Sequence, residues 1–239
     1  MDSVGAHSEV FAPGLLDGRV ALVTGGGTGL GKASALELVR CGARATIVGR
    51  RGEVLEAAAA EINSCADADA GAGAGVDWLA GDVRDREEAE WMVRAVLERH
   101  GRLDVLVNNA GGQFFSPAEL IAAKGWRAVW RLNVEGGLNM AQAAFELAFS
   151  QAGTGTVVNV TLSPHNGMPG MAHSGSARAT VEALTRDLAR RWQPAGVSVT
   201  AVAAGHFDTE VLAKYRACAR ARRAPCRCNV WARSRSTRG

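Results

Sequence analysis

A short apolar run followed at once by a cluster of glycines constrains the fold of this chain more than any other stretch. Residues 20–23 (VALV) precede glycines at positions 25, 26, 27, 29 and 31, and a helix-forming run covers residues 32–40. This order predicts a strand, a tight turn and a helix. Glycines let a backbone approach a pyrophosphate closely, and a helix N-terminus offers N–H groups to it. A dinucleotide-binding turn is therefore favoured over a tight turn without a ligand, although the spacing Gly25-x3-Gly29-x-Gly31 differs from the commoner G-x-G-x-x-G.

Strand-like apolar runs alternate with helix-forming stretches over most of the chain. Beyond the first strand, strands are expected at residues 43–48, 76–80, 103–107, 156–160 and 197–202. Helices are expected at residues 53–62, 85–100 and 172–192, with two helical stretches from a start signal at 116–119 to about residue 151. Such regular alternation predicts an α/β fold with a Rossmann-type, doubly wound parallel sheet, covered by helices on both faces.

The length of 239 residues suits a single α/β domain with a substantial core. Residues 1–17 lack the basic start and apolar stretch of a secretory signal, so they are interpreted as an N-terminal arm. No apolar run reaches the ~18 residues expected of a membrane span. Five cysteines form no recognisable disulfide framework, which favours a reducing compartment.

The last part of the chain, residues 214–239, differs in composition from the rest. It holds nine of the 27 basic residues of the chain and none of the 24 acidic ones. In residues 1–213, acidic residues therefore outnumber basic ones. Two interpretations of this segment are an arm that binds nucleic acid and a metal site at Cys218, Cys226 and Cys228. We favour a third, in which an altered reading frame or splice truncates or replaces the C-terminal part of the fold. Neither a metal nor a nucleic-acid partner is then expected.

A pair of arginines follows the second predicted strand. An NAD site usually has an acidic residue at this position, where it binds the ribose 2′-hydroxyl. Here the sequence is Gly49-Arg50-Arg51, and guanidinium groups suit a 2′-phosphate. This favours NADP(H) as the cofactor, with Arg50 at the phosphate. A solvated pair of arginines at the start of a helix is the alternative.

Several motifs, in order and at the right intervals over residues 18–213, resemble the short-chain dehydrogenase/reductase family. They are Thr24-Gly25-x3-Gly29-x-Gly31, Asp82, Asn108-Asn109-Ala110-Gly111, Asn133 and Ala204-Gly205. The resemblance implies that residues 18–213 form an NADP-binding Rossmann catalytic domain. With Arg50, it implies a cofactor-binding set of Gly25, Thr28, Gly29, Leu30, Gly31, Arg50, Asp82, Val83, Asn109, Ala110, Gly111, Arg178 and Gly205. It also implies a homo-oligomer.

The active-site segment departs from the pattern of that family. A typical member has Tyr-x-x-x-Lys, in which the lysine lowers the pKa of the tyrosine so that the phenol can exchange a proton. The helix register here places Ser174 at the tyrosine position and Arg178 at the lysine position, and the only tyrosine in the chain is Tyr215. Alcohol oxidation through a tyrosinate is therefore disfavoured.

Three stretches are similar to peroxisomal trans-2-enoyl-CoA reductases and, more loosely, to 2,4-dienoyl-CoA reductases. They are residues 111–119 (GGQFFSPAE), 124–126 (KGW) and 173–178 (HSGSAR). The resemblance implies NADPH-dependent reduction of the C=C bond of an enoyl-CoA in fatty-acid metabolism. It also implies a peroxisomal location, although the chain ends in Ser-Thr-Arg-Gly rather than a Ser-Lys-Leu-type signal, and the cytoplasm is the alternative. A dienoyl-CoA reductase and an inactive, truncated NADPH-binding form are the alternative functions.

The candidate catalytic residues are Asn133, Ser163, Ser174 and Arg178. The resemblance implies that Asn133 holds a proton-relay water. Ser163 and Ser174 are candidate hydrogen-bond donors to the thioester oxygen, and Arg178 would add positive charge near the enolate. His173 or His165 could supply the proton for Cα, because only histidine titrates unperturbed near neutrality. The alternatives are a simple turn around Ser163 and a helix cap at His173.

Overall fold

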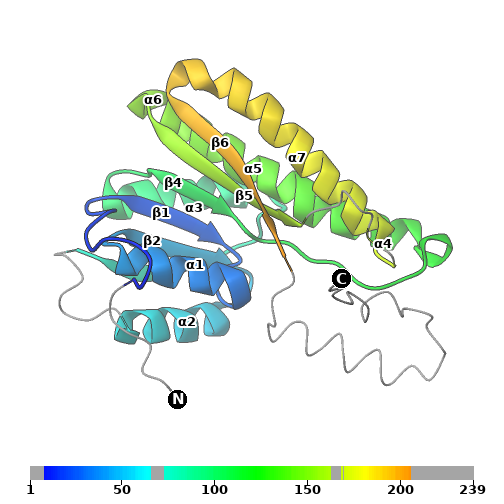
Figure 1. Ribbon diagram of the computed structural model, residues 1–239, viewed down its shortest axis with the longest axis horizontal. Helices are drawn as coiled ribbons and strands as arrows, with labels where there is room; N and C mark the ends of the chain where they lie inside the picture. The colour runs from blue at the N-terminus through cyan, green and yellow to red at the C-terminus, as the bar shows by residue number, and fades with distance from the viewer. Residues whose placement is uncertain (1–7, 66–72, 163–167, 169, 206–239) are drawn as a thin grey trace, which may run out of the picture. The chain divides into compact units, whose positions relative to one another are not determined.

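The computed structural model describes residues 8–65, 73–162, 168 and 170–205 (Figure 1). The strands are β1 (Val20–Thr24), β2 (Arg44–Gly49), β3 (Gly75–Ala80), β4 (Val105–Asn108), β5 (Gly155–Leu162) and β6 (Val197–Ala204). All of them pair in parallel, in the order β3-β2-β1-β4-β5-β6. The predicted doubly wound parallel sheet is thus confirmed, and the order reverses between β1 and β4. Ligands of such sheets bind outside the carboxyl ends of the strands at this reversal.

Helices cover both faces of the sheet (Figure 1). The main helices are α1 (Gly29–Arg40), α2 (Gly52–Cys65), α3 (Arg86–His100), α4 (Ala123–Trp130), α5 (Gly136–Ala144), α6 (Ser150–Ala152) and α7 (Ala172–Trp192). Helices α1 and α2 share one buried apolar cluster with β1 and β2, whereas α3 and α5 belong to a second cluster on the other face. None of the helices in the described part of the chain is long and apolar enough to cross a membrane.

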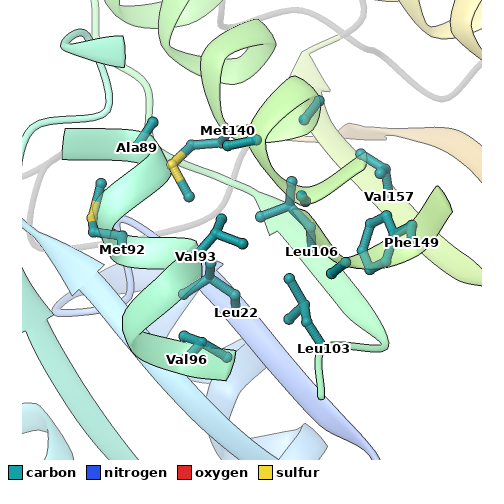
Figure 2. Close-up of a cluster of buried hydrophobic side chains, with 14 of the residues drawn as sticks. Leu22, Ala89, Met92, Val93, Val96, Leu103, Leu106, Met140, Phe149 and Val157 are labelled. Carbon is teal, nitrogen blue, oxygen red and sulfur yellow. The ribbon is translucent and has the colours of Figure 1, made fainter. Parts of the chain in front are cut away.

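The larger of the two apolar clusters joins α3 and α5 to the middle of the sheet (Figure 2). Leu22 of β1 and Leu106 of β4 are fully buried against Met92 of α3 and Met140 of α5. Phe149 closes the cluster beside β5. Full burial of such a side chain contributes roughly 1.5–3 kcal/mol each. This core holds the carboxyl ends of β1 and β4 in place next to the candidate site.

The helical region after β4 differs from the prediction. The start signal at 116–119 produces only the short 3₁₀ turn Ala118–Leu120, because Ile121 is extended and ends it. Residues 123–152 then form one continuous helical segment instead of two separate helices, with π-helical turns at Arg131–Glu135 and Phe145–Phe149. Short π turns inside helices often occur at functional sites. The first of these turns contains Asn133.

The other predicted element boundaries shift by a few residues, and α7 begins and ends as predicted. Part of the predicted N-terminal arm contacts the body, since the N–H of Leu16 donates to the carbonyl of Cys41 at 2.8 Å. Ser163, His165 and residues 206–239 lie outside the described residues. The boundary expected after residue 213 and the nature of the basic tail therefore stay predictions.

Candidate active site

The turn between β1 and α1 has the geometry expected of an anion-binding site. Gly25 and Gly29 have φ angles of 66° and 54°, which favour glycine. Thr28 is the N-cap residue, but its backbone is extended and its side chain makes no capping hydrogen bond. The first turn of α1 also contains no acidic residue. The N–H groups at this helix start are thus available to a phosphate, which the helix dipole also favours.

The end of β4 packs tightly against this turn. The side-chain amide of Asn109 donates to the carbonyl of Thr24 at 2.9 Å, and the N–H groups of Asn109 and Ala110 donate to the Thr24 hydroxyl at 3.0 and 2.9 Å. A Cβ on Gly31 would lie 2.4 Å both from Nδ2 of Asn109 and from the carbonyl oxygen of Gly25. Only glycine at position 31 allows this approach. The residues present therefore fit a dinucleotide cradle.

The ends of β2 and β3 bring charged groups together. Register pairs Gly49 with Ala80, so Arg50 and Asp82 follow neighbouring strand ends. The Nε of Arg84 donates to both carboxylate oxygens of Asp82, at 2.9 and 3.0 Å. This hydrogen bonding lowers the pKa of Asp82, and the charge of Arg50 lowers it further. Sequence analysis missed Arg84, whose only signal is its position two residues after Asp82.

Asn133 binds backbone groups on two sides. Its Nδ2 donates to the carbonyls of Val129 and Gly112, at 2.7 and 2.8 Å, and its Oδ1 accepts from the Gly112 N–H at 3.3 Å. The amide thus ties the segment after β4 to the π turn. The structure places it beside Gly111, and its role in the predicted site, including toward a water molecule, stays a prediction.

Arg178 is a buried cation beside the same glycine segment. It is 8% exposed, and its Nη1 donates to the carbonyl of Val160 at 3.0 Å. A Cβ on Gly111 would lie 2.7 Å from Nη2 of Arg178 and 2.8 Å from Oδ1 of Asn133, so these three residues meet. Burial lowers the pKa of Arg178 to about 10, which keeps it charged at neutral pH. A cavity lined in part by Thr24, Asn133 and Arg178 lies here.

Ser174 and His173 are completely buried in the first turn of α7, at 0% and 1% exposure. The Ser174 hydroxyl and both His173 ring nitrogens have no hydrogen-bond partner among the described residues. The N-cap of α7 is Met171, so the interpretation of His173 as the cap is wrong. Its ring instead packs against Phe114, with ring centres 4.3 Å apart. Burial lowers the pKa of His173, so its neutral form predominates at neutral pH.

A chain of buried amides, missed by sequence analysis, sets the rotation of α7. Asn108 donates to Asn159 at 3.0 Å, Asn159 donates to the Thr185 hydroxyl at 2.9 Å, and that hydroxyl donates to the carbonyl of Val181 at 2.7 Å. Buried polar groups need such partners, which links β4, β5 and α7 in one arrangement. Residues 174, 178 and 185 therefore share the buried side of the helix.

Of the remaining predicted cofactor residues, some lie near the glycine turn and others do not. Leu30 is half-buried in the first turn of α1, and Val83 is buried after β3. Gly205 is exposed at the end of β6, and nothing in the described residues lies within 4 Å of a Cβ built on it. Within the described part of the chain, no three His, Cys, Asp or Glu residues group to hold a metal ion.

Comparison with known proteins agrees with this architecture. Residues 19–219 match the family model described as short chain dehydrogenase, and the chain belongs to this family. The peroxisomal 2,4-dienoyl-CoA reductase of Danio rerio is 34% identical over 200 residues, which cover 83% of this chain and 64% of that protein. The enzyme of the same name from Arabidopsis thaliana is 35% identical over 190 residues, which cover 76% of this chain and 61% of that protein. The chain thus spans under two thirds of either relative.

Solved structures show the same fold. The citronellol catabolism dehydrogenase of Pseudomonas aeruginosa PAO1 has a TM-score of 0.75 and 42% identity, covering 81% of this chain and 77% of its own. An NAD⁺-bound xylitol dehydrogenase has a TM-score of 0.78 and 27% identity, covering 84% of this chain and 75% of its own. An actinorhodin polyketide ketoreductase with NADPH also has a TM-score of 0.78, with 28% identity, covering 90% and 78%. Together these similarities support a nicotinamide cofactor and leave the choice between NAD and NADP open.

Proposed function

We propose that this chain is an oxidoreductase that uses NADPH to reduce the C=C bond of a trans-2-enoyl-CoA, giving an acyl-CoA. The observation that carries the proposal is the buried Arg178, which lies beside Gly111 and Asn133 with Ser174 one helical turn before it. This arrangement supplies a positive charge and a hydroxyl donor. The names of the relatives support reduction of an unsaturated acyl-CoA.

The cofactor would supply the hydride. The cradle around Gly25, Gly29 and Gly31 would hold its pyrophosphate, and Arg50 its 2′-phosphate. Hydride addition at Cβ of the substrate develops negative charge on the thioester oxygen, and a proton from solvent then adds at Cα to give the acyl-CoA. The Ser174 hydroxyl, together with Ser163, would donate hydrogen bonds to that oxygen, and the Arg178 charge would stabilise it further. None of these steps requires a phenolate, which is consistent with the serine at position 174.

A 2,4-dienoyl-CoA reductase is the second candidate function, and the names of the relatives favour it specifically. The two activities share the cofactor and the developing enolate, so the residues around Arg178 suit both. A third candidate is an NADPH-binding chain without turnover. A homo-oligomer and a peroxisomal location belong to the proposal through the family resemblance alone.

The test is NADPH oxidation with trans-2-hexenoyl-CoA, trans-2-decenoyl-CoA and a 2,4-dienoyl-CoA, on protein whose folding is verified by a cooperative thermal melt. Turnover of the two enoyl-CoA substrates supports the proposal. Turnover of the dienoyl-CoA alone assigns the second function. A cooperative melt with saturable NADPH binding but no turnover on any substrate assigns the third.

Arg50→Glu is expected to shift the cofactor preference from NADPH toward NADH. The exposed guanidinium follows β2 where a 2′-phosphate would lie, and a carboxylate there would repel that phosphate. We expect the ratio of kcat/KM values for NADPH and NADH to fall at least about tenfold, since charged hydrogen bonds contribute ~1.5–3 kcal/mol. Arg51→Glu provides a control at the neighbouring residue. An unchanged ratio in Arg50→Glu removes the phosphate assignment.

A further inference from the structure

The start of α7 concentrates buried polar atoms that have no hydrogen-bond partner. Within the described residues these are Nδ1 and Nε2 of His173, Oγ of Ser174 and Nε of Arg178. Buried polar groups without partners are uncommon in folded proteins, and each calls for an explanation such as a ligand. In the proposed reaction, the thioester oxygen would be the ligand that explains Ser174 and Arg178. His173 is a sequence-based candidate for donating the Cα proton, but the proposed reaction takes that proton from solvent and leaves both ring nitrogens of His173 without a partner in the described residues.

The surroundings of His173 are aromatic. Its ring centre lies 4.3 Å from that of Phe114 and 6.3 Å from that of Trp126, and the ring itself is 1% exposed. Burial lowers its pKa, so the ring is neutral at neutral pH. A neutral imidazole has one N–H donor and one nitrogen acceptor. His173 therefore offers a matched donor and acceptor inside an aromatic surrounding.

The helix geometry separates the directions of His173 and Ser174. Consecutive residues of an α-helix are rotated by about 100°, so their side chains do not face each other. Ser174 shares its side of α7 with Arg178, one turn further on. His173 instead faces the segment after β4, through Phe114. A ligand whose one polar group binds at Ser174 and Arg178 can therefore present an adjacent polar group to His173.

We propose that His173 determines specificity by binding the pantetheine amide next to the sulfur of the thioester substrate. This rests on the proposed function. An amide has one carbonyl and one N–H, which complement the acceptor and donor of the neutral ring. Two methylene groups separate this amide from the thioester sulfur, so a thioester oxygen at Ser174 brings it close to the neighbouring residue. Because the His173 ring is buried, the substrate would have to displace a neighbouring side chain, and Trp126, which is 37% exposed and whose ring centre lies 6.3 Å away, is the candidate.

Two small substrates test this assignment. The trans-2-hexenoyl thioester of N-acetylcysteamine contains the amide, whereas the S-pentyl thioester of the same acid has methylenes in its place. We expect the wild-type chain to prefer the amide thioester by about tenfold or more in kcat/KM, since deleting one partner leaves buried groups unpaired. His173→Phe, which keeps an aromatic ring, should reduce this preference to within about twofold, mainly by slowing the amide thioester. His173→Asn, which restores a donor and an acceptor, should recover part of it.

Equal loss on both thioesters in His173→Phe overturns the proposal, because a purely structural ring would slow both alike. A wild-type chain without preference for the amide also overturns it. Binding provides a readout independent of turnover: the saturated hexanoyl thioesters of the same two thiols are titrated calorimetrically into the chain loaded with NADP⁺. A His173-dependent preference in binding without reduction of any enoyl thioester supports the amide site and contradicts the proposed reaction. Absence of that preference in binding contradicts the amide site.

Discussion

Arg178→Met is expected to lower kcat by about 10²–10³-fold, the typical cost of removing a donor to a developing oxyanion, without destabilising the fold. The charge lies beside Gly111 and Asn133, where the thioester oxygen is proposed to develop negative charge. Methionine fills a similar volume but offers neither charge nor donor. The loss should therefore appear in turnover with NADPH and trans-2-hexenoyl-CoA.

The expected stability of Arg178→Met follows from the pKa of Arg178. Burial lowers it from 12.5 to about 10, so the charged form is disfavoured in the folded state relative to the unfolded state. At neutral pH this opposes folding, by up to about 3 kcal/mol for a shift of this size. This unfavourable contribution to folding declines only when the pH rises above the folded-state pKa of about 10. Removing the charge should thus leave the free energy of unfolding, measured by urea denaturation, unchanged or higher.

Two controls make this result specific to the buried charge. Arg178→Lys keeps a cation and introduces the lysine that a typical family member has at this position. This variant should retain most of the activity. Arg186→Met removes an exposed arginine from the same helix and should change neither kcat nor stability. Wild-type kcat in Arg178→Met would contradict the proposed role of the guanidinium, whereas a large loss of stability would contradict the electrostatic cost of its burial.

Gly31→Ala is expected to weaken NADPH binding by about tenfold to a hundredfold, because overpacking typically costs ~1–3 kcal/mol. The new Cβ would lie 2.4 Å from both Asn109 Nδ2 and the Gly25 carbonyl oxygen. The collision would push apart the end of β4, which carries Asn109, and the turn that is proposed to hold the pyrophosphate. The measurement is the Kd for NADPH from fluorescence titration.

Gly52→Ala is the matched control for Gly31→Ala. Its Cβ would lie 3.5 Å from the Trp78 ring, which is ordinary van der Waals contact, and the position is the first residue of α2. It should bind NADPH as the wild type does. If Gly31→Ala retains wild-type affinity with an unchanged melting temperature, the glycine turn is not the pyrophosphate site.

Much of the fold was predictable because it follows from local patterns. The glycine cluster predicted the turn between β1 and α1, and the alternation of apolar runs and helices predicted the parallel sheet. The bounds of α7 followed from one uninterrupted helix-forming stretch, Ala172–Trp192. By contrast, the π turns that make residues 123–152 one continuous segment have no local signal in the sequence. They depend on contacts such as the Asn133 amide with the Val129 carbonyl.

Residues close together in the chain were enough to predict the family, the glycine turn after β1 and the departure from Tyr-x-x-x-Lys at positions 174 and 178. The folded structure was needed to show that Arg178 meets Gly111 and Asn133, that Arg84 binds Asp82, and that both nitrogens of His173 are buried without a partner in the described residues. Such facts depend on how α7 is rotated against the sheet. That rotation is set by hydrogen bonds among Asn108, Asn159 and Thr185, which lie far apart in sequence and meet only in the folded core.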